Sequence, residues 1–315
     1  MEIGKNDRTT GPKIVVLGGI NMDLIGVTPR LPAQGETVIG ERFYTTPGGK
    51  GANQAVAAAK LGASVKMVGR VGADTFGPTM LDDLRRHGID VGGVAVDPHN
   101  PSGIAIILLD ADRQNHIVAI YGANTACDGA QLEAVKAALD GADALMLQLE
   151  IPADVSLAAA EHAKALGIRV VWDPAPALDL PDGALALAEV LTPNQTEAAF
   201  FTGVEVTDAG SAKAAAEALL AKGVKVATVK MGEQGVYYAS QTESGHVPAF
   251  GVEVTDTVAA GDAFGAGLCV ALAEGKSLVE SVRFGAAAGA LAVTRPGAQE
   301  AMPARHEVEK LLESS

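Results

Sequence analysis

Cysteine is nearly absent from this sequence, because Cys127 and Cys269 are the only two among 315 residues. Neither cysteine has partners at the spacing of a zinc site, a C-x-x-C redox motif or a disulfide-rich domain. The sequence therefore argues against those classes and indicates a reducing, cytoplasmic environment.

Aromatic and basic residues are also scarce. Aromatic side chains make up 4% of the chain, and 24 Lys+Arg against 38 Asp+Glu give a formal net charge of −14. Few side chains can stack on bases, and no basic run can neutralise the phosphates of a polymer. We therefore expect no nucleic-acid partner, although the backbone N–H groups of a glycine-rich loop can still bind a small phosphate.

Long apolar runs and the common nucleotide motifs are missing as well. No stretch approaches about 18 consecutive apolar residues, and the first dozen residues lack a signal-peptide core, so no membrane partner is expected. No G-x-G-x-x-G stands between a strand and a helix, which argues against a dinucleotide oxidoreductase. The Walker phosphate loop, the G-x-S-x-G elbow and the H-E-x-x-H zinc motif are absent too.

The 48% apolar content is enough for a full hydrophobic core. Short β-branched runs that suit buried strands alternate with Ala-rich stretches that suit helices, which predicts an α/β fold whose parallel sheet is covered on both faces. The expected strands are KIVVLGG from Lys13, Val65–Val71, Ala144–Leu149, Val170–Trp172 and Val224–Lys230, and the expected helices are Gly51–Leu61, Val155–Leu166 and Ser211–Ala221.

Two segments break this alternation. Glu36–Thr45 and Ile104–Tyr121 have the pattern of extended strands, and the second contains two strands joined by the polar turn Ala111–Asn115. We interpret this small sheet as a lid over the site, a dimer contact, or both. The alternative is an edge hairpin without a functional role.

The segment Asp256–Phe264 carries the strongest chemical signal. Small residues lead into an apolar helix that we expect to begin at Gly261 or Asp262, so the amides of Ala259, Ala260, Gly261 and Asp262 can converge on an anion. A carboxylate at position 262 is placed to accept a hydroxyl proton during phosphoryl transfer. The alternative is that Asp262 only caps the helix.

A second glycine-rich segment, Pro47–Gln54, precedes an Ala-rich helix. Gly48 and Gly49 allow close backbone approach, and Lys50 and Asn53 offer donors for the hydroxyl oxygens of a polyol. The alternative is a turn that only starts the helix.

Polar residues also follow two predicted strands. Asn21 and Asp23 come directly after the first strand, and Glu150 ends the strand ALMLQLE. Open α/β sheets bind their ligands at the carboxyl ends of parallel strands, so we expect these side chains at one site.

Together, and in this order along the chain, these segments resemble the ribokinase family of carbohydrate kinases, the PfkB group. The resemblance spans Lys13 to the C-terminal helix. It implies a three-layer α/β sandwich with a central, mainly parallel sheet and a small β-sheet lid. The implied organisation is one kinase domain over 13–312, with lid strands within 22–46 and 101–122 and a disordered segment 1–12.

The resemblance also implies roles for individual residues. Asp262 matches the catalytic base, next to an anion hole formed by Ala259, Ala260 and Gly261. Asn194 and Glu197 match an N-x-x-E motif that organises Mg²⁺ and the phosphates of ATP. The residues matching a sugar pocket are Asn21, Asp23, Gly49, Lys50, Asn53 and Glu150, and those matching a nucleotide-contacting loop are Lys230, Gly232 and Gly235.

Many members of the family bind a monovalent cation, and the resemblance implies K⁺ held by Asp256, Val258, Val293 and Gly297. Ala301 stands where a serine hydroxyl often completes that shell. Three further positions depart from the pattern of ribose-phosphorylating members. Those members usually carry Asn where this chain has Asp173, often Thr where it has Lys230, and usually Asn where it has Gly265.

The implied activity is ATP-dependent phosphorylation of a sugar, most closely ribose at O5, by a homodimer that associates through the lid. Related substrates stay open, namely other pentoses, fructose, keto-sugar acids and nucleosides. A non-catalytic sugar- or nucleotide-binding regulator on the same fold is the more distant alternative.

Overall fold

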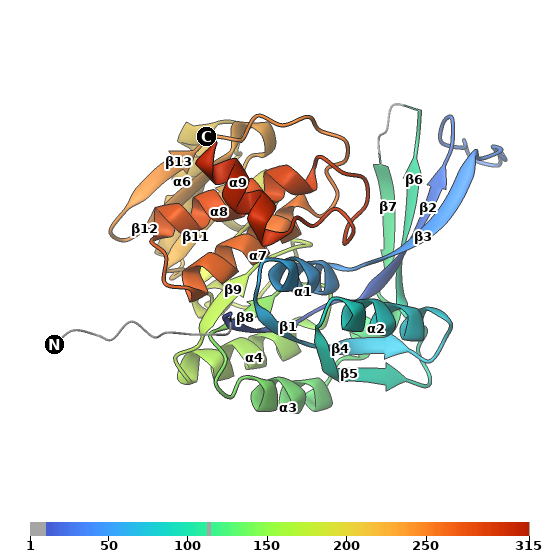
Figure 1. The fold of residues 1–315 in the computed structure, drawn as a ribbon, viewed down its shortest axis with the longest axis horizontal. Helices are drawn as coiled ribbons and strands as arrows, with labels where there is room; N and C mark the ends of the chain where they lie inside the picture. Colours follow the sequence, from blue (N-terminus) through green and yellow to red (C-terminus); the bar gives the residue numbers. More distant parts are fainter. Residues whose placement is uncertain (1–10, 112–114, 315) are drawn as a thin grey trace.

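The computed structural model describes residues 11–111 and 115–314, and a nine-stranded sheet crosses this part of the chain (Figure 1). Seven neighbouring strands, from β11 to β5, are parallel, whereas β12 runs antiparallel to β11 and to β13. The five strands expected from the sequence are all present. The order across the sheet is β13 (Ser244–Val247), β12 (Val236–Ser240), β11 (Val226–Lys230), β10 (Val190–Leu191), β9 (Arg169–Trp172), β8 (Ala144–Leu147), β1 (Lys13–Leu17), β4 (Ser64–Gly72) and β5 (Asp90–Asp97).

Helices cover both faces of this sheet, as the alternating pattern predicts. In β1, Ile14 and Val16 pack into one core while Val15 and Leu17 pack into the other, because successive side chains point to opposite faces. The first core is closed by α1 (Lys50–Lys60), α2 (Phe76–Arg86), α7 (Ala260–Ala273), α8 (Leu278–Ala292) and α9 (Arg305–Glu313). The second is closed by α3 (Gly129–Ala138), α4 (Ala153–Ala165), α5 (Gln195–Thr202) and α6 (Ala209–Ala221). The 3₁₀ helices are η1 (Gly122–Ala126), η2 (Ala184–Leu187) and η3 (Gly232–Gln234).

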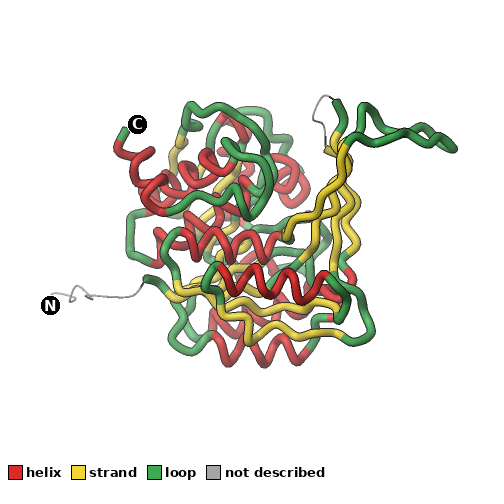
Figure 2. Tube along the Cα trace, turned by 45° about the vertical axis from the view of Figure 1, so that its right-hand side comes forward, coloured by secondary structure: helices red, strands yellow, loops and turns green. Residues whose placement is uncertain are grey.

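A second sheet projects from this body (Figures 1 and 2). Its strand order is β3 (Arg42–Gly48), β2 (Asn21–Val27), β6 (Gly103–Leu109) and β7 (Asn115–Ile120), and we call it the lid sheet. Strands β6 and β7 form the predicted antiparallel hairpin. Residues 112–114 of the predicted turn lie outside the described residues.

The first predicted lid strand is too long at its beginning. We expected Glu36–Thr45 to be extended, but β3 begins only at Arg42. Glu36 lies instead in a turn, where its amide donates to the Ala33 carbonyl at 3.0 Å and its carboxylate accepts the Ala33 amide at 2.9 Å and pairs with Arg30. These local hydrogen bonds replace the ladder bonds that a strand would need.

The start of the described chain belongs to the body. Pro12 was expected in a disordered segment, but it is buried and its carbonyl accepts the Ser64 amide at 2.9 Å. Residues 1–10 of that expected segment lie outside the described residues.

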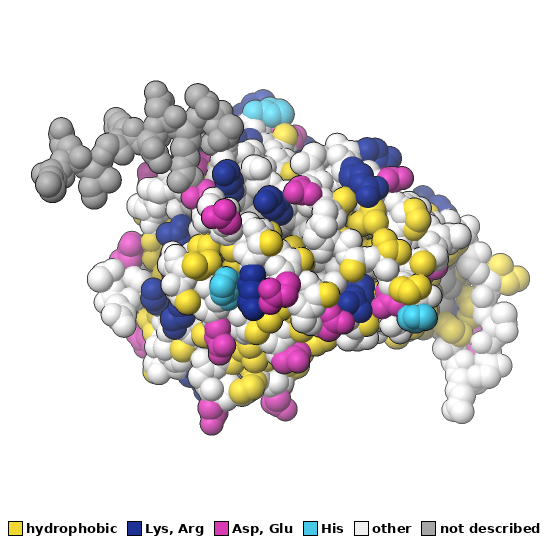
Figure 3. Space-filling view, turned by 90° about the horizontal axis from the view of Figure 1, so that it is seen from below, with side chains coloured by type: hydrophobic (Ala, Val, Ile, Leu, Met, Phe, Trp, Pro, Cys, Tyr) yellow, Lys and Arg dark blue, Asp and Glu magenta, His cyan; other side chains and the backbone are white. Residues whose placement is uncertain are grey.

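The surface drawn in Figure 3 carries Lys and Arg side chains scattered among acidic and apolar ones, without a continuous basic stripe on that face. In the part of the chain that the structure describes, no helix combines the length and apolar character needed to cross a bilayer. Cys127 and Cys269 are both free and buried.

Candidate active site

The predicted site residues meet where five neighbouring strands end. Glu150 follows β8, Asp173 follows β9, Asn194 follows β10, Lys230 ends β11 and Asn21 follows β1. These strands are adjacent in the order β11-β10-β9-β8-β1, so their carboxyl ends lie at one edge of the sheet. The packed helices α1 and α7 both begin at this edge, which brings segments from the whole chain to one place.

Helix α1 begins in a turn that only glycine fits. Gly49 has φ 90°, and a Cβ at this position would lie 2.6 Å from the Asn21 amide nitrogen. A Cβ on Gly51 would lie 2.7 Å from the Gly18 carbonyl carbon. The segment therefore starts a helix, as the alternative interpretation held, and it also brings Lys50 and Asn53 against the strand ends.

Helix α7 begins at Ala260, one residue before the earlier of the two predicted starts. The residue before it, Ala259, has a left-handed backbone with φ 59°, which costs about 1–2 kcal/mol for a residue with a Cβ. Among the described residues the amides of Gly261 and Asp262 donate no hydrogen bond, and that of Ala260 makes only a long one, 3.5 Å, to Thr257. The helix start therefore offers free donors to an anion.

Asp262 lies in the third position of α7, so it is not the N-cap that the alternative interpretation supposed. Its carboxylate is only 4% exposed and accepts Asn53 Nδ2 at 3.0 Å and Gln54 Nε2 at 3.1 Å. Burial raises the pKa of Asp262, although the charge of Lys50 and the two amide donors oppose this rise. The carboxylate is therefore oriented and more basic than an ordinary aspartate.

Glu150 joins the first strand to the start of α1. Its Oε2 accepts the Lys50 amide at 2.8 Å and Asn21 Nδ2 at 3.4 Å. Burial raises the pKa of Glu150 to about 7 against the opposing charge of Lys50. The Asn21 side chain is held from its other end by Asn124, whose Nδ2 donates to Asn21 Oδ1 at 2.8 Å.

Besides Gln148 Oε1, which lies against Gly18, two buried acceptors at this edge have no partner in the described residues. Asn53 Oδ1 is buried without a hydrogen bond, and the Asp23 carboxylate, 7% exposed, accepts none. Burial, together with the charges of Asp262 and Glu300, raises the pKa of Asp23 to about 7. A buried acceptor without a donor is costly, so both groups fit a ligand that supplies hydroxyl hydrogens.

Lys50 provides positive charge among these acids. Burial opposes its ammonium form, but the carboxylates of Asp262, Asp173, Glu150 and Glu197 together raise the pKa of Lys50. Its Nζ donates no hydrogen bond within the described chain, so the ammonium is free to contact an anionic ligand.

Asn194 and Glu197 form a reciprocal cap at the start of α5. Asn194 Oδ1 accepts the Glu197 amide at 2.9 Å, while the two Glu197 oxygens accept the Asn194 amide at 2.8 Å and Nδ2 at 2.9 Å. Both side chains are already hydrogen-bonded within the cap. They are therefore better suited to hold Mg²⁺ through bridging water than to coordinate it directly. Within the described residues, no group of three or more His, Cys, Asp or Glu side chains forms a metal cluster.

The predicted nucleotide loop is a tight turn between β11 and β12. Gly232 and Gly235 have φ 57° and 85°, and a Cβ on Gly235 would lie 2.1 Å from the Val247 carbonyl oxygen. The loop therefore needs glycine at these positions for its own geometry.

Two of the other three predicted cation ligands, Val258 and Gly297, lie against the Asp256 carboxylate. Its oxygens accept the Val258 amide at 3.0 Å and the Gly297 amide at 3.1 Å, which ties the loop before α7 to the loop after α8. Val293 does not fit, because its carbonyl oxygen already accepts the amides of Thr255 and Asp256 at 2.7 and 3.2 Å. A cation here would use Asp256 with the carbonyls of Val258 and Gly297.

Several site residues were not assigned a role from the sequence. Gln54 is fully buried and donates to Asp262, and Asp173 pairs with Lys230 at 2.9 Å. The position of Gln54 directly after Asn53 was the only signal. The others are Asn124, Gln148, Thr192 and Tyr121. Burial and the charge of Glu150 raise the pKa of Tyr121 to about 12.

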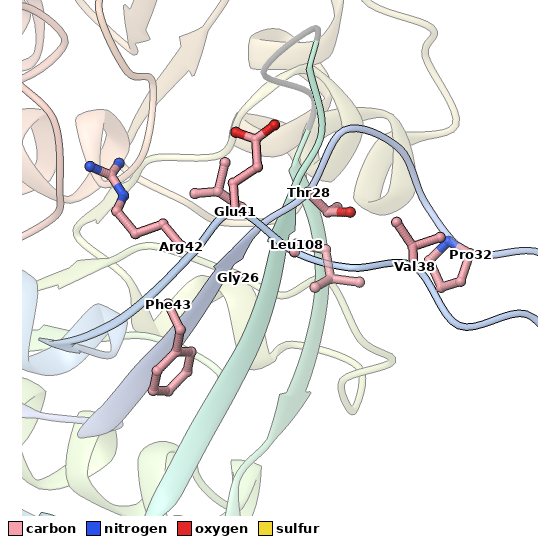
Figure 4. A pocket seen from close by; sticks show the side chains of 10 residues that line it. Gly26, Thr28, Pro32, Val38, Glu41, Arg42, Phe43 and Leu108 are labelled. Carbon is pink, nitrogen blue, oxygen red and sulfur yellow. The ribbon is translucent and has the colours of Figure 1, made fainter.

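A cavity of about 440 Å³ lies away from these acids, at the outer end of the lid sheet (Figure 4). None of the residues that line it is among the predicted site residues, so the cavity is not part of the candidate active site. It is lined by Gly26, Val27, Thr28, Pro32, Val38, Gly40, Glu41, Arg42, Phe43 and Leu108.

Comparison with known proteins gives consistent matches. The model of the pfkB family of carbohydrate kinases matches residues 12–305. Ribokinase of Haemophilus influenzae is 40% identical over 300 residues, covering 95% of this chain and 98% of that protein. Deoxyribokinase of Salmonella typhi is 38% identical over 252 residues, covering 80% and 82%. The structure of Arabidopsis thaliana ribokinase complexed with ribose and ATP superposes with a TM-score of 0.89 at 35% identity, covering 98% of this chain and all (100%) of that one.

Proposed function

Since this chain belongs to the pfkB family of carbohydrate kinases, we propose that it transfers the γ-phosphoryl group of ATP to O5 of D-ribose. The observation that carries the proposal is the Asp262 carboxylate, buried and oriented by Asn53 and Gln54 beside the free amides of α7. These are the two groups that transfer to an alcohol needs, an acceptor for the proton and donors for the phosphoryl oxygens.

In the proposed reaction Asp262 accepts the proton of the sugar hydroxyl. The hydroxyl oxygen then bonds to the γ-phosphorus while the bond from phosphorus to the bridging oxygen breaks, and ADP leaves. Negative charge spreads over the phosphoryl oxygens, where the amides of Gly261 and Asp262 and the ammonium of Lys50 stabilise it. Positioning supplies most of the catalysis, because the groups already point to one place.

The sugar site that we propose is the set of unpartnered acceptors. Asp23 and Asn53 accept hydroxyl hydrogens, while Glu150 holds the start of α1 through the Lys50 amide. The Arabidopsis thaliana protein, whose structure holds ribose, supports ribose as the substrate of this chain. The similarity to deoxyribokinase keeps 2-deoxyribose as the main competing substrate.

ATP binds, in this proposal, along Lys230, Gly232, Gly235 and Asn194. Mg²⁺ held through water by Asn194 and Glu197 would neutralise phosphate charge. A cytoplasmic location, where ATP and reduced thiols are available, fits the two free and buried cysteines.

A potassium ion near Asp256 would add positive charge behind the loop that leads into α7. The Asp256 carboxylate fits a cation because, in the described residues, it accepts hydrogen bonds from two backbone amides and pairs with no Lys or Arg side chain. Equal rates in potassium and in a bulky organic cation would contradict this assignment.

The test is ADP release by the purified chain with a panel of sugar and nucleoside acceptors. We expect the highest kcat/KM for D-ribose, a lower value for 2-deoxyribose because one hydroxyl contact is lost, and little activity with fructose or nucleosides. A preference for another acceptor would correct the substrate, and no ADP release with any acceptor would favour the non-catalytic regulator.

A further inference from the structure

A buried ion pair lies beside the proposed phosphoryl site. Lys230 Nζ donates to Asp173 Oδ1 at 2.9 Å, and the two side chains are 14% and 4% exposed. Removing two charges from water costs several kcal/mol, and such a pair gives little net stability compared with apolar residues. A role in the chemistry of the site explains why the charges are kept there.

The ammonium of Lys230 lies against the start of α7. It is 3.1 Å from the position that a Cβ on Gly261 would occupy. Gly261 is the second residue of that helix, and its amide is free in the described chain. A fixed ammonium therefore stands next to the amides that face the transferred group, where preorganised positive charge is most effective.

Asp173, which follows β9, holds this lysine and is itself hydrogen-bonded to residues of β10's end and of α1. Its Oδ1 also accepts Thr192 Oγ1 at 3.3 Å, and its Oδ2 accepts Gln54 Nε2 at 3.4 Å. Thr192 follows β10 and Gln54 belongs to α1, so the carboxylate is oriented from both sides. Lys230 is thereby held more tightly than a single ion pair would hold it.

The same glutamine connects the ion pair to the base. Gln54 Nε2 donates to Asp262 Oδ1 at 3.1 Å as well as to Asp173, and Gln54 Oε1 accepts Gln148 Nε2 at 2.6 Å. The bond from Gln148 fixes which end of the Gln54 amide faces the two carboxylates. A continuous hydrogen-bonded chain therefore runs from Lys230 through Asp173 and Gln54 to Asp262.

We propose that Lys230 is a catalytic residue whose ammonium contacts the phosphoryl group during transfer, and that Asp173 is the positioning residue that holds it in line with Asp262. The inference rests on the proposed sugar kinase activity and adds a chemical role for this pair. Phosphoryl transfer spreads negative charge over three oxygens, and Lys230 supplies a donor to them from the side of β11.

The test compares four variants of the full chain: Lys230→Met, Lys230→Arg, Asp173→Asn and the double variant Asp173→Asn/Lys230→Met. Lys230→Met is expected to lower kcat about 10²-fold while the ribose Kd stays within about threefold, because a transition-state donor is lost. Asp173→Asn is expected to lower kcat roughly 10- to 100-fold through misplacement of the ammonium. Lys230→Arg should recover part of the loss.

The double variant tests whether Asp173 and Lys230 act together in catalysis or affect kcat independently. It contains no unpaired buried charge, and we expect its kcat to equal that of Lys230→Met if the main catalytic effect of Asp173 is to hold Lys230. Thermal unfolding of each variant measures the structural effect. Arg169→Met is the matched control, since it breaks the 2.6 Å pair with Glu189 at the opposite end of β9 and should leave kcat unchanged.

A second measurement does not depend on turnover. Binding of ADP with aluminium fluoride and ribose mimics the transferring phosphoryl group, and Lys230→Met should weaken it at least tenfold more than it weakens ADP alone. A kcat for Lys230→Met within twofold of wild type, or additive losses in the double variant, would overturn the inference and leave the proposed function intact. Absence of ADP release by the wild-type chain would overturn both.

Discussion

Asp262 combines three properties that a general base needs and that neighbouring carboxylates share only in part. It is buried, its two oxygens accept side-chain amides, and it lies within the first turn of a helix whose amides are free. Burial raises the pKa of Asp262, which makes the carboxylate a stronger base, and the charge of Lys50 opposes this rise.

Replacement of this base gives the first residue-scale prediction. Asp262→Asn should lower kcat by about 10²–10⁴-fold because the proton acceptor is lost, while ribose binding stays within a few fold. The rate of ADP release measures kcat, and calorimetric titration with ribose measures sugar binding. Asp97→Asn, at another buried aspartate whose carboxylate accepts the backbone amides of His99 and Asn100, is the control and should retain turnover. Wild-type turnover in Asp262→Asn would remove this residue from its role.

Asp23 gives a second prediction, for stability against pH. Burial and the charges of Asp262 and Glu300 raise the pKa of Asp23 to about 7. Between about pH 4 and 7 the native state therefore holds a proton that the unfolded chain releases, so this group makes stability fall as pH rises through that window.

Asp23→Asn should remove this loss. The expected gain in the free energy of unfolding is on the order of 2 kcal/mol at pH 8 and close to zero at pH 4. Urea unfolding at the two pH values is the measurement. An equal gain at both pH values would show that the pKa of Asp23 is not the cause.

At the scale of single elements, α1 depends on a close contact with the end of β1. Gly51 and Gly18 allow the helix to approach the strand, and this approach places Asn53 and Gln54 against Asp262. The Ala-rich sequence of α1 serves the same packing, because small side chains let the helix lie close to the sheet.

Gly51→Ala tests this contact. The added Cβ would lie 2.7 Å from the Gly18 carbonyl carbon, so the helix must shift, at a cost of about 1–3 kcal/mol. Both the melting temperature and kcat should fall. Gly129→Ala at the start of α3 is the matched control, because its Cβ meets nothing within 4 Å, and it should be neutral or stabilising. Unchanged kcat in Gly51→Ala would contradict the link between helix approach and catalysis.

At the scale of the whole molecule, the lid sheet exposes more apolar surface than a solvated sheet normally does. Phe43, Ile117 and Val118 are 69%, 54% and 60% exposed. Exposed apolar patches of this kind mark interaction sites. We therefore predict that the chain is a homodimer associated through the lid sheets.

Because neighbouring residues in a strand point to opposite faces, the double variant Ile117→Asp/Val118→Asp places a charge on each side of the lid. Sedimentation should give a dimer for the wild-type chain and a 31.9 kDa monomer for this variant. Leu166→Asp, at an exposed apolar residue on the body, should stay dimeric. A monomeric wild-type chain would contradict the prediction.

The sequence by itself determined the α/β class, the five expected strands and the segments that carry the chemistry. Glycine runs, strand ends and the Asp262 segment are local signals, and local backbone geometry decides what they form. Local signals were less accurate at boundaries: α7 begins at Ala260, and Glu36 lies in a turn.

Only the tertiary structure decided which groups meet. Gln54 and Asp262 are 208 positions apart, and Lys230 and Asp173 are 57 apart, yet each pair is within hydrogen-bond distance. Such contacts depend on the order of strands in the sheet and on how closely α1 and α7 approach it. Strand order and helix approach are both set by long-range packing of the two cores. The residues next to each member of a pair in the sequence therefore give no signal of the contact.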